Sequence, residues 1–156
     1  MNMMILLLAL LIGIVAGLRA MTAPAAISWA AHLGWLHLGD SWLAFLGYAL
    51  TPWIFTALAI VELVTDQLPS TPSRKVPVQF GTRIVMGALC GAAVGISGGW
   101  ALGGAVAGVI GAGIGTLAGA NIRGRLARSF GQDRPAAIIE DVVAIVAAFL
   151  IVAALP

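Results

Sequence analysis

Residues 81–120 read GTRIVMGALCGAAVGISGGWALGGAVAGVIGAGIGTLAGA, forty residues in which Arg83 is the single charged side chain. As one α-helix this stretch would be about 60 Å long, which is twice the ~30 Å hydrocarbon thickness of a bilayer. It therefore predicts two membrane-crossing helices that form a hairpin. The turn is expected within SGGWALGG, Ser97–Gly104, where glycines interrupt the apolar run.

The composition of the whole chain agrees with a membrane location. Of the 156 residues, 61% are hydrophobic and 9% are charged, whereas soluble domains carry about 25% charged residues. The length suits one transmembrane domain over residues 1–156. The single cysteine, Cys90, excludes an intrachain disulfide. We expect no cofactor and no nucleic-acid partner, because topology and anionic lipid explain the basic residues better.

Prolines, paired glycines and charges divide the chain into six apolar segments. This pattern predicts an all-α integral membrane bundle of six short transmembrane helices. Several segments are shorter than the ~20 residues that a straight crossing needs, and the second either crosses the bilayer or re-enters on the same side. The expected segments are Met3–Leu18, Ala23–Leu38, Trp42–Thr65, Gly81–Gly98, Trp100–Ala120 and Pro135–Leu155.

The basic residues give this threading an orientation. With six crossings, all eight Lys and Arg residues fall on one side of the membrane. Cytoplasmic loops are rich in Lys and Arg, so this side is expected to face the cytoplasm. Both termini are then expected outside.

Glycines recur at every fourth position in the long apolar stretch. Such stripes let helix backbones approach closely, so we expect a glycine-packed hairpin. The partner could be another helix of this chain or of a second subunit, and a homodimer is expected. The echo of IGIVAG (residues 12–17) in IGTLAG (residues 114–119) favours a repeat of two three-helix halves, although such short matches also arise by chance. The stripe comprises Gly87, Gly91, Gly95, Gly99, Gly103, Gly111, Gly115 and Gly119.

Four acids lie inside apolar segments. Glu62 and Asp66 share one helix face, and Glu140 and Asp141 lie more than one turn inside the last segment. An ionised acid at such depth costs at least ~2.5 kcal/mol, so these side chains should face the bundle interior and take partners. The candidate partners at the same membrane level are Arg19, Arg83 and Arg134.

These residues support two main interpretations. In the first, Glu62 and Glu140 bind a cation or proton near the cytoplasmic side of a small secondary transporter or channel for an ion or small solute. Asp66 and Asp141 would tune the field there, and Arg19 and Arg83 would balance the charge.

In the second interpretation, the same acids and arginines are structural ion pairs in a non-catalytic membrane scaffold or assembly protein. An intramembrane enzyme that acts on lipid is a third possibility, but no recognised catalytic motif supports it. The sequence leaves the identity of any metal unknown. His32, His37 and Asp40 have poor spacing for a metal site, because positions five apart on a helix diverge by about 140°.

Three stretches carry a family resemblance. GLRAMTAPA (residues 17–25), ELVTDQLPSTPSR (residues 62–74) and DRPAAIIEDVVA (residues 133–144) are similar to a family of small bacterial inner-membrane proteins defined as a domain of unknown function. The family's E-x-x-x-D-[KQ]-x-P element reads here as Glu62, Asp66, Gln67 and Pro69. The resemblance covers nearly the whole chain and implies a multi-pass protein of the bacterial inner membrane. It implies no substrate.

A weaker likeness is to small cation exporters built from two repeats of three spans, which carry an E-x-G-D-K-[ST] motif. This chain spaces Glu62 and Asp66 four apart, lacks the Gly-Asp pair and has Gln67 in place of Lys. These departures argue against carrying over a manganese or calcium assignment.

Overall fold

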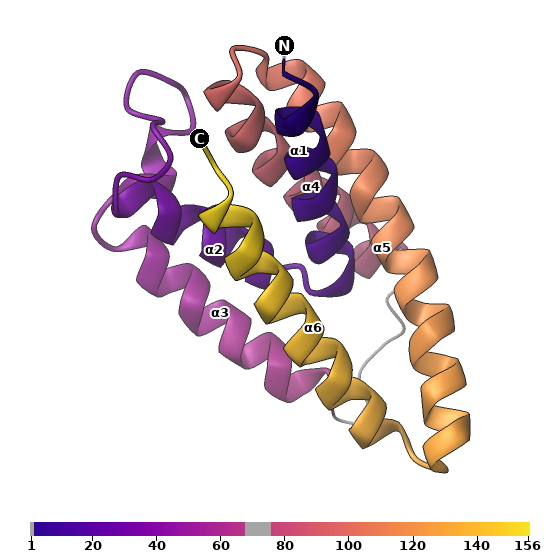
Figure 1. Cartoon of the computed structure of the whole chain (residues 1–156). Helices are drawn as coiled ribbons and strands as arrows, with labels where there is room; N and C mark the ends of the chain where they lie inside the picture. Colours follow the sequence, from indigo (N-terminus) through magenta and orange to yellow (C-terminus); the bar gives the residue numbers. More distant parts are fainter. Residues whose placement is uncertain (1, 68–75) are drawn as a thin grey trace.

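The computed structural model describes residues 2–67 and 76–156, which are almost entirely helical (Figure 1). Within these two ranges there are six α-helices, one short 3-10 helix and no strand. The predicted all-α class is therefore confirmed. The elements are α1 (Met3–Leu18), α2 (Thr22–His32), η1 (Ala44–Gly47), α3 (Thr51–Thr65), α4 (Pro77–Ser97), α5 (Ala101–Phe130) and α6 (Asp133–Ala153).

Helix length separates the bundle into two groups. The helices α4, α5 and α6 have 21, 30 and 21 residues and are apolar enough to cross a membrane. The helices α1 and α3 are apolar but have 16 and 15 residues, and α2 has 11. At 1.5 Å per residue, α2 covers about 16 Å, roughly half the hydrocarbon thickness. The long apolar helices indicate a membrane protein.

The structure shifts several of the expected boundaries. The second segment is helical as far as His32 instead of Leu38, and turns follow it because Gly34 adopts φ 84°. The third segment is interrupted, and α3 begins at Thr51, with Pro52 in its first turn, where proline is tolerated. The fifth helix runs ten residues past Ala120, because the basic stretch after it remains helical to Phe130.

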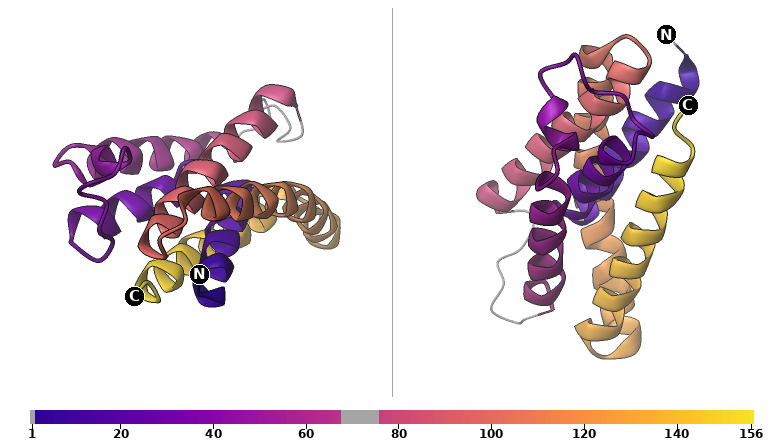
Figure 2. Two further views of the ribbon diagram at one scale, coloured as in Figure 1. Left: turned by 90° about the horizontal axis from the view of Figure 1, so that it is seen from above. Right: turned by 90° about the vertical axis from the view of Figure 1, so that its left-hand side faces the viewer.

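The helices α1, α4 and α5 form the tightest part of the bundle (Figures 1 and 2). The predicted hairpin is present, with its turn between Ser97 and Ala101. A Cβ atom placed on Gly91 would collide with the carbonyl oxygen of Gly104. A Cβ atom placed on Gly13 of α1 would collide in the same way with the carbonyl oxygen of Gly108. Helix α5 thus has backbone neighbours in both α4 and α1.

The glycine positions on α5 differ from the single stripe that spacing predicts. Gly104 and Gly108 face α4, whereas Gly111 and Gly115 face α1. Gly103 lies against the ring of Trp100 at the turn. Four residues advance an α-helix by about 400°, so an every-fourth stripe drifts by about 40° per step. Over thirty residues this drift divides the small positions between two neighbours.

Helix α3 lies at the edge of the bundle. It packs mainly on α2 and η1, and Pro52 and Ala59 are its buried residues. The Trp29 indole N–H donates a 2.8 Å hydrogen bond to the Thr56 hydroxyl and joins α2 to α3. Both chain termini lie at one end of the bundle, called here the termini end (Figure 1).

Candidate functional site

The candidate site forms where the chain breaks between α1 and α2. Helix α1 ends at Leu18, and Arg19 has extended backbone angles of φ −142° and ψ 110°. Helix α2 begins at Thr22, with Pro24 in its first turn, where the missing N–H of proline leaves no helical bond unmade. The break turns the chain sharply and places Arg19 between the C-terminal end of α1 and the N-terminal end of α2.

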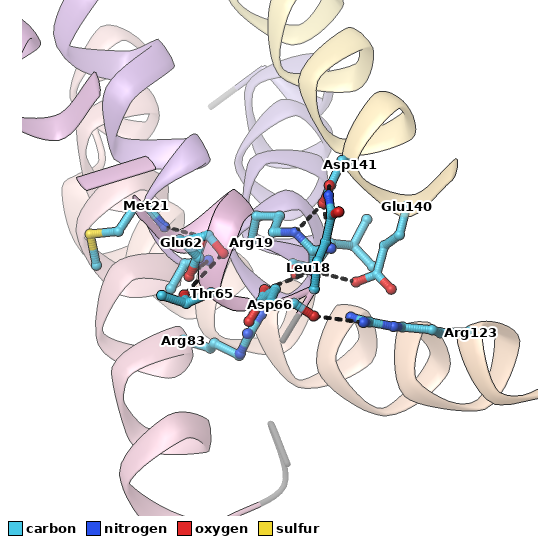
Figure 3. A network of polar contacts seen from close by, with 12 residues as sticks. Leu18, Arg19, Met21, Glu62, Thr65, Asp66, Arg83, Arg123, Glu140 and Asp141 are labelled. Carbon is cyan, nitrogen blue, oxygen red and sulfur yellow. Dashed lines mark hydrogen bonds and ion pairs between the residues drawn. The ribbon is translucent and has the colours of Figure 1, made fainter. Parts of the chain in front are cut away.

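Arg19 is completely buried and contacts three carboxylates (Figure 3). Its Nε donates to Asp141 Oδ1 at 2.6 Å, and its Nη2 also contacts this oxygen. Its Nη1 lies 2.9 Å from Glu140 Oε1 and 3.1 Å from Asp66 Oδ2. One guanidinium therefore connects the α1–α2 break to α3 and α6.

Glu62 caps the start of the chain segment that leads into α2. Its two carboxylate oxygens accept hydrogen bonds from the backbone N–H groups of Ala20 and Met21, at 3.0 and 3.1 Å. These donors are left without a helical partner by the break, so a carboxylate is well suited to them. Glu62 thus binds backbone, whereas Asp66, one turn later, binds Arg19.

Arg83 approaches the break from α4. It is buried, and its Nη1 donates a 2.8 Å hydrogen bond to the carbonyl oxygen of Gly17. The Thr116 hydroxyl lies 3.4 Å from the same oxygen and 2.8 Å from the carbonyl oxygen of Ala112. The last turn of α1 is therefore held by both helices of the hairpin.

The cluster lies well inside the ends of the long helices. Arg83 comes six residues after the start of α4, and Glu140 comes seven residues after the start of α6. These offsets correspond to about 9 and 10 Å along the two helix axes. On α5, Thr116 precedes the helix end by fourteen residues, or about 21 Å. The helices α4, α5 and α6 therefore extend beyond the level of the cluster, away from the termini end.

All six predicted site residues thus occur in one region. Asp66, Glu140 and Asp141 meet on Arg19, while Glu62 and Arg83 reach the same break through backbone groups (Figure 3). Their role in binding stays a prediction. The other expected partner, Arg134, is exposed. Pro69 and the residues up to 75 lie outside the described part of the chain.

Sequence reasoning missed three members of this region. Gln67 donates from Nε2 to Asp141 Oδ2 at 3.2 Å. Arg123 donates to the carbonyl oxygen of Asp66 at 2.8 Å and pairs with Asp133 at 2.7 Å. Thr116 is the third. The position of Gln67 in the family element was an available signal, but nothing in the local sequence distinguishes Arg123 from its basic neighbours.

The carboxylates are not arranged as a metal centre. Among residues 2–67 and 76–156, no group of three or more His, Cys, Asp or Glu side chains is placed to hold a metal ion. The oxygens instead accept from guanidinium, amide and backbone N–H groups. Taken alone, the six predicted residues comprise four acids and two arginines, a formal net charge of −2.

Comparison with known families identifies one relationship. Residues 6–155 match a family described as a domain of unknown function (DUF4126). The chain belongs to this family. The match covers the candidate site, α1 from Leu6 onward and the other five helices in full, in agreement with the resemblance seen in the sequence. No curated protein and no solved structure matches the chain, so membership brings no activity with it.

Proposed function

We propose that the protein is a small secondary transporter or channel for an ion or small solute. The observation that carries this proposal is the convergence of four carboxylates and two arginines at an interrupted helix inside the apolar bundle. Many secondary transporters bind substrates and coupling ions at interrupted helices, whose free backbone groups take part. Acids within membrane segments are rare because their burial is costly, and they commonly mark ion pathways.

The substrate class that fits this site best is a cation or a proton. The six-residue cluster carries a formal charge of −2, which a proton, a bound cation or basic residues outside the described ranges would offset. The carboxylate oxygens already accept hydrogen bonds, and a proton needs no coordination shell of its own. We assign ion binding to Glu62 and Glu140, field tuning to Asp66 and Asp141, and charge balance to Arg19 and Arg83.

The proposal includes a membrane arrangement. The chain would cross the bacterial inner membrane six times or cross with α2 re-entrant, with both termini outside and the acidic site toward the cytoplasm. The basic residues beyond the cluster, such as Arg125 and Arg128, support this orientation. The proposal also includes a glycine-packed hairpin, a repeat of two three-helix halves and a homodimer.

A second candidate is a non-catalytic scaffold or assembly protein. One observation favours it: Arg19 is fully buried and contacts three carboxylates from two helices. Such pairing fixes helices relative to one another and is found where a buried charge serves architecture. In this alternative the acids bind no ligand.

The experiment compares ligand response with simple stability. The purified protein is melted in detergent across pH and with added mono- and divalent cations. It is then reconstituted in vesicles that contain a pH dye, and proton entry is recorded under an imposed membrane potential. The variants Glu62→Gln and Glu140→Gln are tested beside Asp40→Asn, a matched control because Asp40 is an exposed acid between α2 and η1.

The transporter proposal expects a saturable rise in melting temperature or a potential-driven flux that either Gln variant abolishes and Asp40→Asn preserves. A ligand at one hundred times its Kd stabilises a protein by about 2.7 kcal/mol, which a melt detects readily. Variants that melt earlier, together with no ligand response and no flux in the native protein, would favour the scaffold.

A further inference from the structure

A large apolar cavity lies between α2, α3 and α6, on the termini side of the cluster. Its volume is about 410 Å³, within the ~300–1,000 Å³ range of ligand pockets. Residues of α2, α3 and α6 line it. Its wall includes Ala26, Trp29, Ala59, Leu63, Ala148 and Phe149.

The polar atoms of the wall show what kind of ligand fits. The Thr56 hydroxyl is engaged, since it accepts from Trp29 and donates to the carbonyl oxygen of Pro52 at 2.7 Å. The Thr22 hydroxyl, at the inner end, is buried without a hydrogen-bond partner among the described residues. A polar solute would therefore lose its hydrogen bonds to water and find almost no hydrogen-bond partners in the cavity. Water is also disfavoured, because apolar cavities stay dry.

A second, shallower cavity continues from the first toward the termini end. Its volume is about 390 Å³, and it shares Trp35 and Val152 with the larger cavity. Gly34, His37 and Pro156 also line it, and His37 is exposed. An apolar slot thus opens beside Trp35 onto a more polar rim that includes the exposed His37, as a lipid with one buried tail requires. In membrane proteins, tryptophan is enriched where the hydrocarbon of the bilayer meets the lipid headgroups and water.

We propose that these two cavities bind one phospholipid of the surrounding membrane. One acyl chain occupies the slot between α3 and α6, and the headgroup lies at the rim beside Trp35 and His37. This acyl chain extends to Thr22 and Leu63, which are next in sequence to Met21 and Glu62 of the candidate site. The lipid thereby supports α3, which otherwise packs mainly on α2 and η1. This proposal does not depend on the transport function.

Photolabelling tests the proposal directly. The full chain in vesicles is illuminated with a phosphatidylcholine that carries a diazirine at the end of one acyl chain, and the labelled residues are mapped by mass spectrometry. We expect saturable labelling at the inner wall of the cavity, on α2 around Thr22 and on α3 around Leu63. Excess unlabelled phosphatidylcholine should compete with this labelling.

A matched pair of variants on one helix separates the cavity from the general lipid contact. Ala59→Phe places a ring in the cavity, whereas Ala57→Phe adds the same ring on the exposed face of α3. We expect Ala59→Phe to lower saturable labelling about tenfold, equivalent to about 1.4 kcal/mol, and Ala57→Phe to leave it unchanged. If Ala59→Phe fails to fold, Ala26→Phe blocks the same cavity from α2.

Four results would overturn the proposal. Labelling could spread evenly over the exposed face of α3, or excess unlabelled lipid could fail to compete with it. The two phenylalanine variants could be labelled equally. Cross-links between two copies of the chain at the cavity wall would show that a second subunit, and not a lipid, covers this slot.

Discussion

Replacement of Arg19 with methionine removes the guanidinium on which the candidate site is built. Methionine retains much of the side-chain volume, so the main loss is charge and hydrogen bonding. Asp141, Glu140 and Asp66 each lose a donor that lies between 2.6 and 3.1 Å away. Removal of one partner from a buried ion pair costs about 3–5 kcal/mol. Asp141 keeps one hydrogen bond in the variant, from Gln67. We therefore expect Arg19→Met to lower the free energy of unfolding by an amount within this range, although three carboxylates lose a contact.

The assay is reversible unfolding in mixed micelles, followed by circular dichroism as the denaturing detergent is increased. Arg19→Lys tests geometry apart from charge, since an ammonium group cannot make the forked contacts of a guanidinium. We expect it to lose about 1.5–3 kcal/mol, the value of hydrogen bonds to charged groups. Arg128→Ala is the control, because Arg128 is exposed on α5, and it should change the free energy of unfolding by less than about 0.5 kcal/mol.

A free energy of unfolding for Arg19→Met within about 1 kcal/mol of the native value would show that the Arg19 guanidinium does not stabilise the fold through these ion pairs. A combined variant adds a sharper check. Arg19→Met with Asp141→Asn and Glu140→Gln removes charge from both sides of the network, so part of the lost stability should return. A further loss in the triple variant would mean that the acids stabilise the fold by contacts other than those to Arg19.

Two further predictions concern packing. Gly108→Ala should destabilise the bundle by about 1–3 kcal/mol, because its Cβ would collide with the Gly87 carbonyl oxygen. A Cβ at Gly113 would meet no heavy atom within 4 Å, so Gly113→Ala should stabilise the protein by about 0.5–1 kcal/mol. Equal effects of the two variants in the same unfolding assay would contradict the close approach of α4 and α5 at Gly108. Trp29→Phe should cost about 0.5–1.5 kcal/mol through loss of the bond to Thr56, and an unchanged unfolding curve would show that this bond does not hold α3 to α2.

Local sequence predicted the helices that extend regularly through apolar chain. The forty-residue stretch with one charge predicted the α4–α5 hairpin and its turn, because length and hydropathy alone exclude a single crossing. Pro52 and Pro77 mark helix starts in the structure, at the N-terminal positions that proline favours. The predicted end of the second helix was wrong, because the stretch from Leu33 to Leu38 is as apolar as the helix but is not helical.

The positions of the six residues in apolar segments are enough to show that they need polar partners, but which partners they have depends on how the helices pack. The cost of burying a charge depends only on its place in an apolar segment, so Glu140 and Asp141 could be identified from the chain itself. The choice of Arg19 instead of Arg134 depended on the break after Leu18. Contacts between residues more than a hundred positions apart are set by helix packing, which no local pattern encodes. The cavity beside Thr22 has the same origin, because it exists only where α2, α3 and α6 come together.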